Sequence, residues 1–404
     1  MKSVNASLAQ LLKYPFPYKA MISICSDLDE TPDAETYFEC IKYLNTNEKT
    51  IMGRGVNLEV GNSIYFKMPD NQFSYWNTDD KGRKSIKSLI LSGHIDCIHS
   101  YGDFVTRREE VKEILEELKG YSLDVWIDHA QAITNFDSEI MEGQGANIKS
   151  SAYHADLTLE HGVSFVWKGR VTSVIAQNVK RSYAGIFSVN HPISSVICIL
   201  KEFAKGVLGR FGNEKYRMHH LNRVMVESVL EDGSKVYEFM RSNPSFAGVS
   251  TNETAMGIKN VISSRVLNNL VRKEGCTILY THLGKIGRKS EPFDEAARQA
   301  FELLSAYQAN GSLKVTSTRK LLAYLRAKET LDWEASKELN SLTFYVNTAY
   351  LSDIGGLSWL VDRSSDYRIY INGEIYHDFE VLPLRDEKDV ISIPWKFLEF
   401  PQLV

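Results

Sequence analysis

The run Ala20-Met21-Ile22-Ser23-Ile24-Cys25-Ser26, followed by Asp27-Leu28-Asp29-Glu30, decides the fold class of this chain. The first seven residues are uncharged and rich in apolar side chains, which predicts a buried strand. Acidic residues follow at once, and Thr31 with Pro32 then predicts an N-cap and the first position of a helix. A buried strand that leads directly into a helix is the repeating unit of a parallel α/β fold.

The same order of short strand and helix recurs as far as about residue 328. We expect strands at 88–92, 123–127, 163–167, 276–280 and 313–316, each rich in β-branched or aromatic residues. A capping box at 106–109 predicts the start of a helix that stops at Gly120, and apolar periodicity predicts helices at 293–309 and 318–327. The chain therefore predicts a parallel α/β architecture over most of its length.

The last part of the sequence has a different pattern. Helical periodicity is absent from residue 341 onward, and the alternating run 367–371 precedes Asn372-Gly373, a pair typical of two-residue hairpin turns. We divide the chain into an α/β domain at 1–335 and a small β-rich domain at 336–404. An inserted hairpin region is expected near 205–246, where Asp232-Gly233 separates two strand-like runs.

Composition excludes several classes of protein. The 404 residues include 47 Lys+Arg and 51 Asp+Glu, for a net charge of -4, with no block of basic residues that would grip nucleic acid. The five cysteines lack the spacing of a zinc ribbon or a disulfide framework, which favours a reducing compartment. No apolar run approaches the ~18 residues of a bilayer span, and no leader is visible. We expect a cytoplasmic protein without a membrane span, and the sequence indicates no oligomeric state.

Two carboxylates follow the first strand at a spacing of two. Asp27 and Asp29 face the same way in an extended chain, and two carboxylates so close repel unless a cation or a proton lies between them. The alternative is a simple acidic turn that caps the following helix.

Histidines at two later strand ends supply further candidates. His99 and Asp103 are four residues apart, so one helical turn or a coiled loop places an imidazole and a carboxylate on one face. Together with Asp29 they would form a three-ligand open metal site. His282 leaves the end of the 276–280 strand, as a general acid would. The alternatives are an unrelated polar loop and a structural histidine.

Three other polar residues could bind a substrate. Asp128 and His129 follow the 123–127 strand, where they could hold a sugar hydroxyl or orient a neighbouring group. His154 lies in a polar stretch that could wall a sugar site, although its alternation with Asp156 also suits one polar face of a strand.

The stretch 20–29, the spacing from Gly93-His94 through His99 to Asp103, and the run 276–282 together resemble three motifs of the polysaccharide deacetylases, the NodB-homology metal-dependent deacetylases. The resemblance covers about residues 15 to 330 and implies a distorted (β/α) barrel. It also implies that Asp27 is the general base, Asp29 and His99 are metal ligands, and His282 is the general acid. The sequence departs from the family at Asp103, which replaces a histidine ligand, and at 126–129, where an Arg-Pro stretch is usual.

The resemblance implies a hydrolase that removes the acyl group of an N-acetylated or O-acylated sugar, in the biosynthesis of a surface polysaccharide. The donor set Asp29, His99 and Asp103 would hold Zn²⁺, or a harder divalent ion such as Mn²⁺. One alternative role for Asp27 is to orient a neighbouring group. Alternative functions are a catalytically degenerate protein that binds glycan or assists glycan assembly, and a metal-independent glycoside hydrolase. The chain has no G-x-S-x-G elbow of a serine hydrolase.

Overall fold

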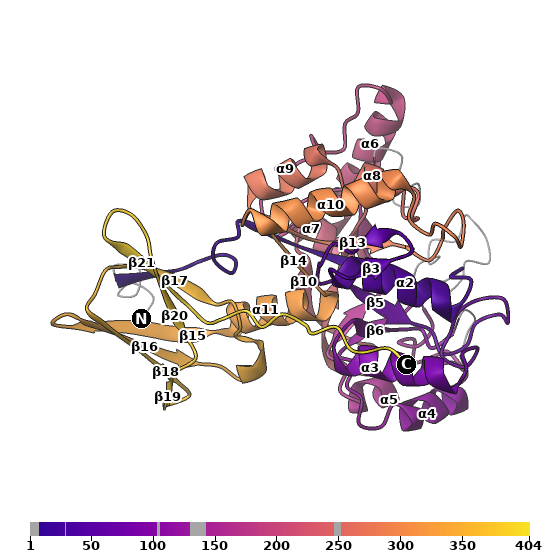
Figure 1. Ribbon diagram of the computed structural model, residues 1–404, viewed down its shortest axis with the longest axis horizontal. Coiled ribbons are helices and arrows are strands. Elements are labelled where there is room, and N and C mark those ends of the chain that lie inside the picture. Colours follow the sequence, from indigo (N-terminus) through magenta and orange to yellow (C-terminus); the bar gives the residue numbers. More distant parts are fainter. Residues whose placement is uncertain (1–7, 29, 103–105, 130–142, 246–251) are drawn as a thin grey trace.

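The computed structural model describes residues 8–28, 30–102, 106–129, 143–245 and 252–404. Its main feature is a curled, mostly parallel sheet covered by helices, with two further antiparallel or mixed sheets at one end of the molecule (Figure 1). This arrangement confirms the predicted α/β class. No helix in the described ranges is long and apolar enough to cross a bilayer.

Within the described part of the chain, eleven strands form the main sheet, and among their pairings only β10–β11 is antiparallel. In spatial order they are β10 (Met225–Val229), β11 (Lys235–Phe239), β8 (Phe165–Trp167), β7 (Val125–Ile127), β6 (Ile95–His99), β5 (Gly61–Ile64), β2 (Ala20–Ser26), β13 (Cys276–Thr281), β12 (Arg241–Ser242) and β9 (Val171–Thr172), with β14 (Leu313–Thr316) on β2.

The sheet curls until its two ends are linked by one short piece of chain. β11 pairs with β8, whereas β12 pairs with β13 and β9, and only Met240 separates β11 from β12. Asp232-Gly233 makes the expected hairpin turn between β10 and β11, with Gly233 at φ +87°. The region predicted as an insertion near 205–246 therefore contributes strands to the main sheet.

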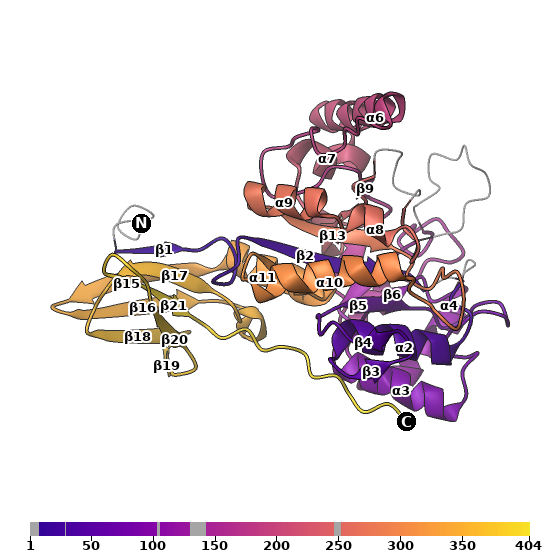
Figure 2. The same cartoon turned by 45° about the horizontal axis from the view of Figure 1, so that its top comes forward.

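Helices cover the outer side of this sheet (Figure 2). They are α2 (Ala34–Asn45), α3 (Asp80–Leu91), α4 (Arg108–Glu117), α5 (Ala155–Glu160), α6 (Pro192–Arg210), α7 (Arg217–Leu221), α8 (Ile258–Val261), α9 (Ser264–Lys273) and α10 (Glu295–Ala309). The remaining helix, α11 (Thr318–Thr330), instead packs in one cluster with the inward-facing Met21 and Cys25 of β2. Short segments between them form the 3-10 turn η1 (Glu214–Tyr216) and the hairpin β3 (Lys49–Thr50) with β4 (Gly53–Arg54).

Two local predictions were wrong. The N-cap of α2 is Asp33, whose carboxylate accepts a hydrogen bond of 2.8 Å from Thr36 N, and not Thr31. The predicted strand at 88–92 is the end of α3 and its C-cap, because Ile86, Leu89 and Ile90 recur at helical spacing and are buried along one face. The strand of this unit is β6, which lies within the predicted loop.

The C-terminal part contains two sheets packed face to face. One consists of β15 (Asp332–Glu338), β16 (Ser341–Asn347), β18 (Asp366–Ile371) and β19 (Glu374–Tyr376); the other of β1 (Ala9–Leu11), β17 (Ser358–Asp362), β21 (Lys388–Ser392) and β20 (Glu380–Pro383), and η2 (Leu351–Asp353) precedes β17. Phe344 and Trp359 meet between the sheets, with ring centroids 5.3 Å apart. Asn372-Gly373 turns between β18 and β19, with both residues at positive φ, as expected.

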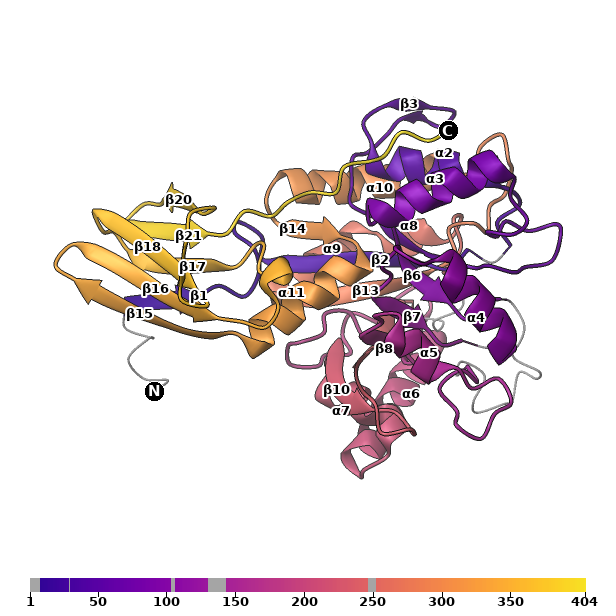
Figure 3. The same cartoon turned by 90° about the horizontal axis from the view of Figure 1, so that it is seen from below.

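We placed a domain boundary at residue 335, but the N-terminal strand packs on the C-terminal part and the C-terminal residues pack on the α/β part. β1 pairs with β17 of the C-terminal part, and the last residues run back over the α/β part (Figure 3). Trp395 Nε1 donates to Glu59 at 3.2 Å, and Val404 N donates to Ser85 Oγ at 3.0 Å. α11 joins the two parts and is buried nearly all round, as expected of a helix between two packed layers.

Candidate active site

Polar side chains gather at the carboxyl ends of the parallel strands. Asp27 directly follows β2, His99 is the last residue of β6, and His282 directly follows β13. Alternate residues of a strand face the same side of a sheet, so each of these side chains continues an inward-facing row. The carboxyl ends of parallel strands are the usual place for chemistry in α/β folds.

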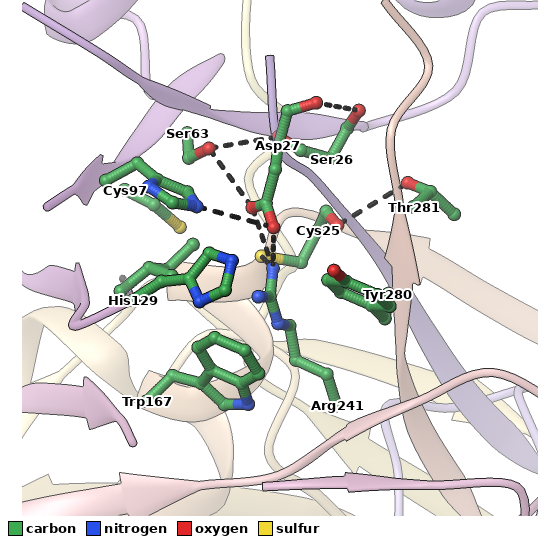
Figure 4. A network of polar contacts seen from close by, with 12 residues as sticks. Cys25, Ser26, Asp27, Ser63, Cys97, His129, Trp167, Arg241, Tyr280 and Thr281 are labelled. Atoms are coloured by element: carbon green, nitrogen blue, oxygen red, sulfur yellow. Dashed lines mark hydrogen bonds and ion pairs between the residues drawn. The ribbon is translucent and has the colours of Figure 1, made fainter. Parts of the chain in front are cut away.

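Asp27 lies at the centre of the cluster and is fully buried (Figure 4). Arg241 Nη1 donates to both of its carboxylate oxygens, at 2.7 Å to Oδ1 and 2.8 Å to Oδ2. Ser63 Oγ donates to Oδ1 at 3.3 Å. The carboxylate is therefore held in one orientation by a cation and a hydroxyl group.

Two imidazole rings approach the same carboxylate oxygen. His99 Nε2 is 3.5 Å from Asp27 Oδ2, and His282 Nε2 is 3.9 Å from it. His99 Nε2 is also 3.0 Å from the hydroxyl group of Tyr65, and His282 Nε2 is 3.4 Å from that of Tyr280. The three motifs that suggested the resemblance thus bring one residue each to a single buried cluster.

Arg241 is the functional residue that sequence reasoning missed. It begins β12, and its guanidinium carbon is 3.7 Å from the ring centroid of Trp167 and 4.4 Å from that of Tyr280. Such cation–π contacts stabilise a desolvated arginine. The only signal in the sequence was a basic residue within a strand-like run, in a segment that we had interpreted as an insertion.

The charges of the cluster fix the protonation state of Asp27. Burial by itself raises the pKa of a carboxyl group, but the positive charge of Arg241, with further contributions from His99 and His282, holds the pKa of Asp27 well below its ordinary value. Burial works in the opposite direction on Arg241, whose pKa nevertheless rises because of the Asp27 carboxylate. The pair is ionised at neutral pH.

Of the three metal ligands implied by the resemblance, only His99 lies within the described residues. Asp29 and Asp103 lie outside the described residues, and within the described ranges no group of three His, Cys, Asp or Glu side chains is arranged to hold an ion. His99 Nδ1 is buried and has no hydrogen-bond partner among the described residues, whereas Nε2 faces Asp27 and Tyr65. His99 therefore fits a role as one metal donor, because its buried Nδ1 makes no hydrogen bond to the described residues.

His129 lies beside the cluster. Its ring centroid is 5.4 Å from that of His99 and 5.7 Å from that of Trp167. Its backbone is held by Ser100 Oγ, which accepts a hydrogen bond of 2.7 Å from His129 N. Of the three residues predicted to bind substrate, this is the one that the structure places next to Asp27 and His99.

Asp128 and His154 lie on the opposite, helix-covered side of β7. Asp128 is buried, and its carboxylate accepts hydrogen bonds from the backbone N–H groups of Gly145 and Ala146, at 3.2 and 3.1 Å. His154 is the N-cap of helix α5 and does not belong to a strand. It is buried against Trp126, and its Nδ1 is 3.0 Å from Thr158 Oγ1. These contacts hold the 143–158 segment against the sheet.

Comparison with known proteins identifies no relative of this chain. No family model, curated protein or solved structure matches the chain.

Proposed function

We propose that this chain is a metal-dependent hydrolase that removes an acyl group from a sugar, built on a barrel of the NodB type. The observation that carries the proposal is that Asp27 Oδ2 lies within 3.5 Å of His99 Nε2 and 3.9 Å of His282 Nε2. The expected base, one expected metal donor and the expected acid thus meet at one oxygen atom. The curled parallel sheet, whose ends are linked at Met240, supports the choice of barrel.

Asp27 would act as an ionised carboxylate. Because its pKa is depressed, it is a weak base and accepts a proton only from a water that is itself acidic. A divalent ion held by Asp29, His99 and Asp103 would supply that acidification and would polarise the acyl carbonyl. Arg241 keeps the carboxylate charged before the reaction and fixes the direction in which it accepts the proton.

His282 would provide the proton for the leaving group. Its Nε2 faces the Asp27 carboxylate, which orients the ring for proton donation. As the tetrahedral intermediate collapses, this proton passes to the departing amine or alkoxide and the carbon–nitrogen or carbon–oxygen bond breaks. Acetate, or the corresponding acyl acid, and the free sugar are the products.

A second function is favoured by one specific contact. Arg241 already binds both oxygens of Asp27, as a fixed internal counter-ion would in a protein that has kept the fold and lost the reaction. The chain would then bind an acylated glycan without hydrolysing it.

The test is release of acetate from N-acetylglucosamine oligosaccharides and from an O-acetylated polysaccharide, with added Zn²⁺ or Mn²⁺ and with chelator. We expect metal-dependent acetate release that is absent in Asp27→Asn. Glycan binding without acetate release by the metal-loaded protein would select the second function. Release of reducing ends without metal would instead identify a glycoside hydrolase.

A further inference from the structure

α6 and its C-cap Phe211 turn an apolar face to the outside of the molecule. Ile193, Leu200 and Phe211 are 76%, 60% and 83% exposed. The other exposed large apolar side chains of this segment are Val196, Ile197, Phe203 and Leu208. At 3.6 residues per turn these positions fall on one side of the helix and form a continuous stripe along its length. We call this set of seven side chains the α6 stripe.

The inner face of α6 explains why the stripe faces outward. The residues buried there are Ser195, Cys198, Glu202 and Gly206. Glu202 Oε2 accepts a hydrogen bond of 2.6 Å from Thr172 Oγ1, and Cys198 Sγ lies 3.7 Å from the carbonyl oxygen of Ser245. Because these small and polar groups are bonded to the sheet edge, α6 cannot rotate to bury its apolar side.

The charged side chains that border the stripe within α6 are cations, and the exposed Glu214 just beyond this segment faces Arg217 at 3.8 Å. Between residues 187 and 213 the only acidic residue is Glu202, which is buried and paired with Lys205 at 2.7 Å. Lys201 and Arg210 are exposed and, at 3.6 residues per turn, border the stripe on opposite sides. An outward face of Ile, Leu and Phe side chains bordered by cations matches the interface of an anionic bilayer, where apolar groups enter the acyl region and cations meet phosphate.

We infer that α6 docks the protein on an anionic membrane surface, lying in the plane of the interface with the stripe inserted. The helix has 19 residues and is about 28 Å long at 1.5 Å per residue, enough to lie flat over several lipids. Figures 1 and 2 both show it at an outer edge of the α/β part. This inference does not depend on the proposed hydrolase activity, because it concerns a different surface.

A second copy of the chain fits this face less well. Two copies that met through α6 would each bring only exposed cations, Lys201 and Arg210, and no exposed carboxylate of this segment to pair with them. Like charges across an interface oppose association, whereas anionic headgroups attract them.

Hydrogen bonds connect α6 to the strand that carries Arg241. Thr172, which binds Glu202 of α6, belongs to β9, and β9 pairs with β12 at Val171 and Arg241. One side-chain hydrogen bond and one strand pairing thus connect the docked helix to Arg241, which orients Asp27.

The experiment is flotation of the full chain with vesicles of phosphatidylcholine alone or mixed with phosphatidylglycerol. We expect binding to the anionic vesicles that weakens as salt is added. Leu200→Glu should lower the bound fraction at least about tenfold, because the side chain that would enter the bilayer is lost and a carboxylate is placed at the interface. Lys201→Gln with Arg210→Gln should weaken binding to anionic vesicles severalfold.

Leu91→Glu is the matched control, since Leu91 is also a helical leucine and is 68% exposed, on α3. It should float like the unchanged protein, and both leucine variants should keep the melting temperature. Failure of the unchanged protein to float with either vesicle would overturn the inference, as would equal flotation of Leu200→Glu. A dimer in sedimentation equilibrium that Leu200→Glu dissociates, without vesicle binding, would assign the stripe to a second copy.

Discussion

Arg241 Nη1 lies 2.7 and 2.8 Å from the two carboxylate oxygens of Asp27, and both side chains are fully buried. The two residues are 214 positions apart in the chain. Their pairing therefore ties β2 to β12 and fixes the charge at the carboxyl ends of the strands. A buried charge that loses its only strong counter-ion is costly, so this pair gives the clearest test of the site.

Arg241→Met should destabilise the protein by about 3–5 kcal/mol at pH 7, because it leaves the Asp27 carboxylate buried without its cation. Urea unfolding of the two single variants and of Asp27→Asn with Arg241→Met measures the coupling. The double variant should lose less stability than the sum of the single variants. Strictly additive losses would show that the contact contributes nothing.

The same variant should reverse part of the pH dependence of stability. In the unchanged protein the depressed pKa of Asp27 contributes stability above about pH 4, which is lost as pH falls through the folded-state pKa. Without Arg241, burial raises the pKa of Asp27, so that its carboxylate should disfavour folding as pH rises above about 4. Unfolding curves between pH 4 and 7 should therefore show Arg241→Met losing stability, relative to Asp27→Asn with Arg241→Met, as pH increases.

Asp27→Asn and His282→Gln should each lower kcat for acetate release by about 10²–10⁴-fold, because each removes a group that transfers a proton. Both substitutions keep the size of the side chain, so the melting temperature controls for folding. Steady-state assays with the metal-loaded protein provide the measurement. If kcat of His282→Gln stays within twofold of that of the unchanged protein, His282 is not the general acid.

Tyr65→Phe should weaken metal binding by about 10–100-fold, because the Tyr65 hydroxyl group contacts His99 Nε2 at 3.0 Å and fixes the ring of that donor. Titration with Zn²⁺ against a competing chelator reports the affinity directly. Tyr75→Phe is a matched control, since Tyr75 OH bonds Glu117 and not the cluster. Equal affinities of Tyr65→Phe and the unchanged protein would separate His99 from the metal site.

His154 should make stability fall in mildly acidic solution. Burial lowers its pKa to about 4, so the folded state binds its proton less readily than the unfolded state does. The stability that comes from burying neutral His154 is fully present above pH 6.5 and is lost as pH falls toward 4. Between pH 7.5 and 4.5, His154→Asn should lose up to about 3 kcal/mol less stability than the unchanged protein in urea unfolding. Parallel losses in the two proteins would contradict this assignment.

The sequence determined the elements whose signals are local. β2 and β14 occupy the predicted ranges 20–26 and 313–316, because short apolar runs between polar residues specify buried strands. Asn372-Gly373 makes its hairpin turn because both residues adopt positive φ readily. The positions of Asp27 and His282 at strand ends followed from the same patterns.

Only the tertiary structure decided which of these side chains meet. β5 has the sequence Gly-Asn-Ser-Ile, which gives no strand signal, yet it lies between β2 and β6 and sets the spacing of Asp27 and His99. Arg241 contacts Asp27 because the curled sheet brings β12 beside β13. Local propensity fixes where a strand runs, but the pairing of strands distant in the chain depends on how the whole core packs, and that pairing placed a cation on Asp27.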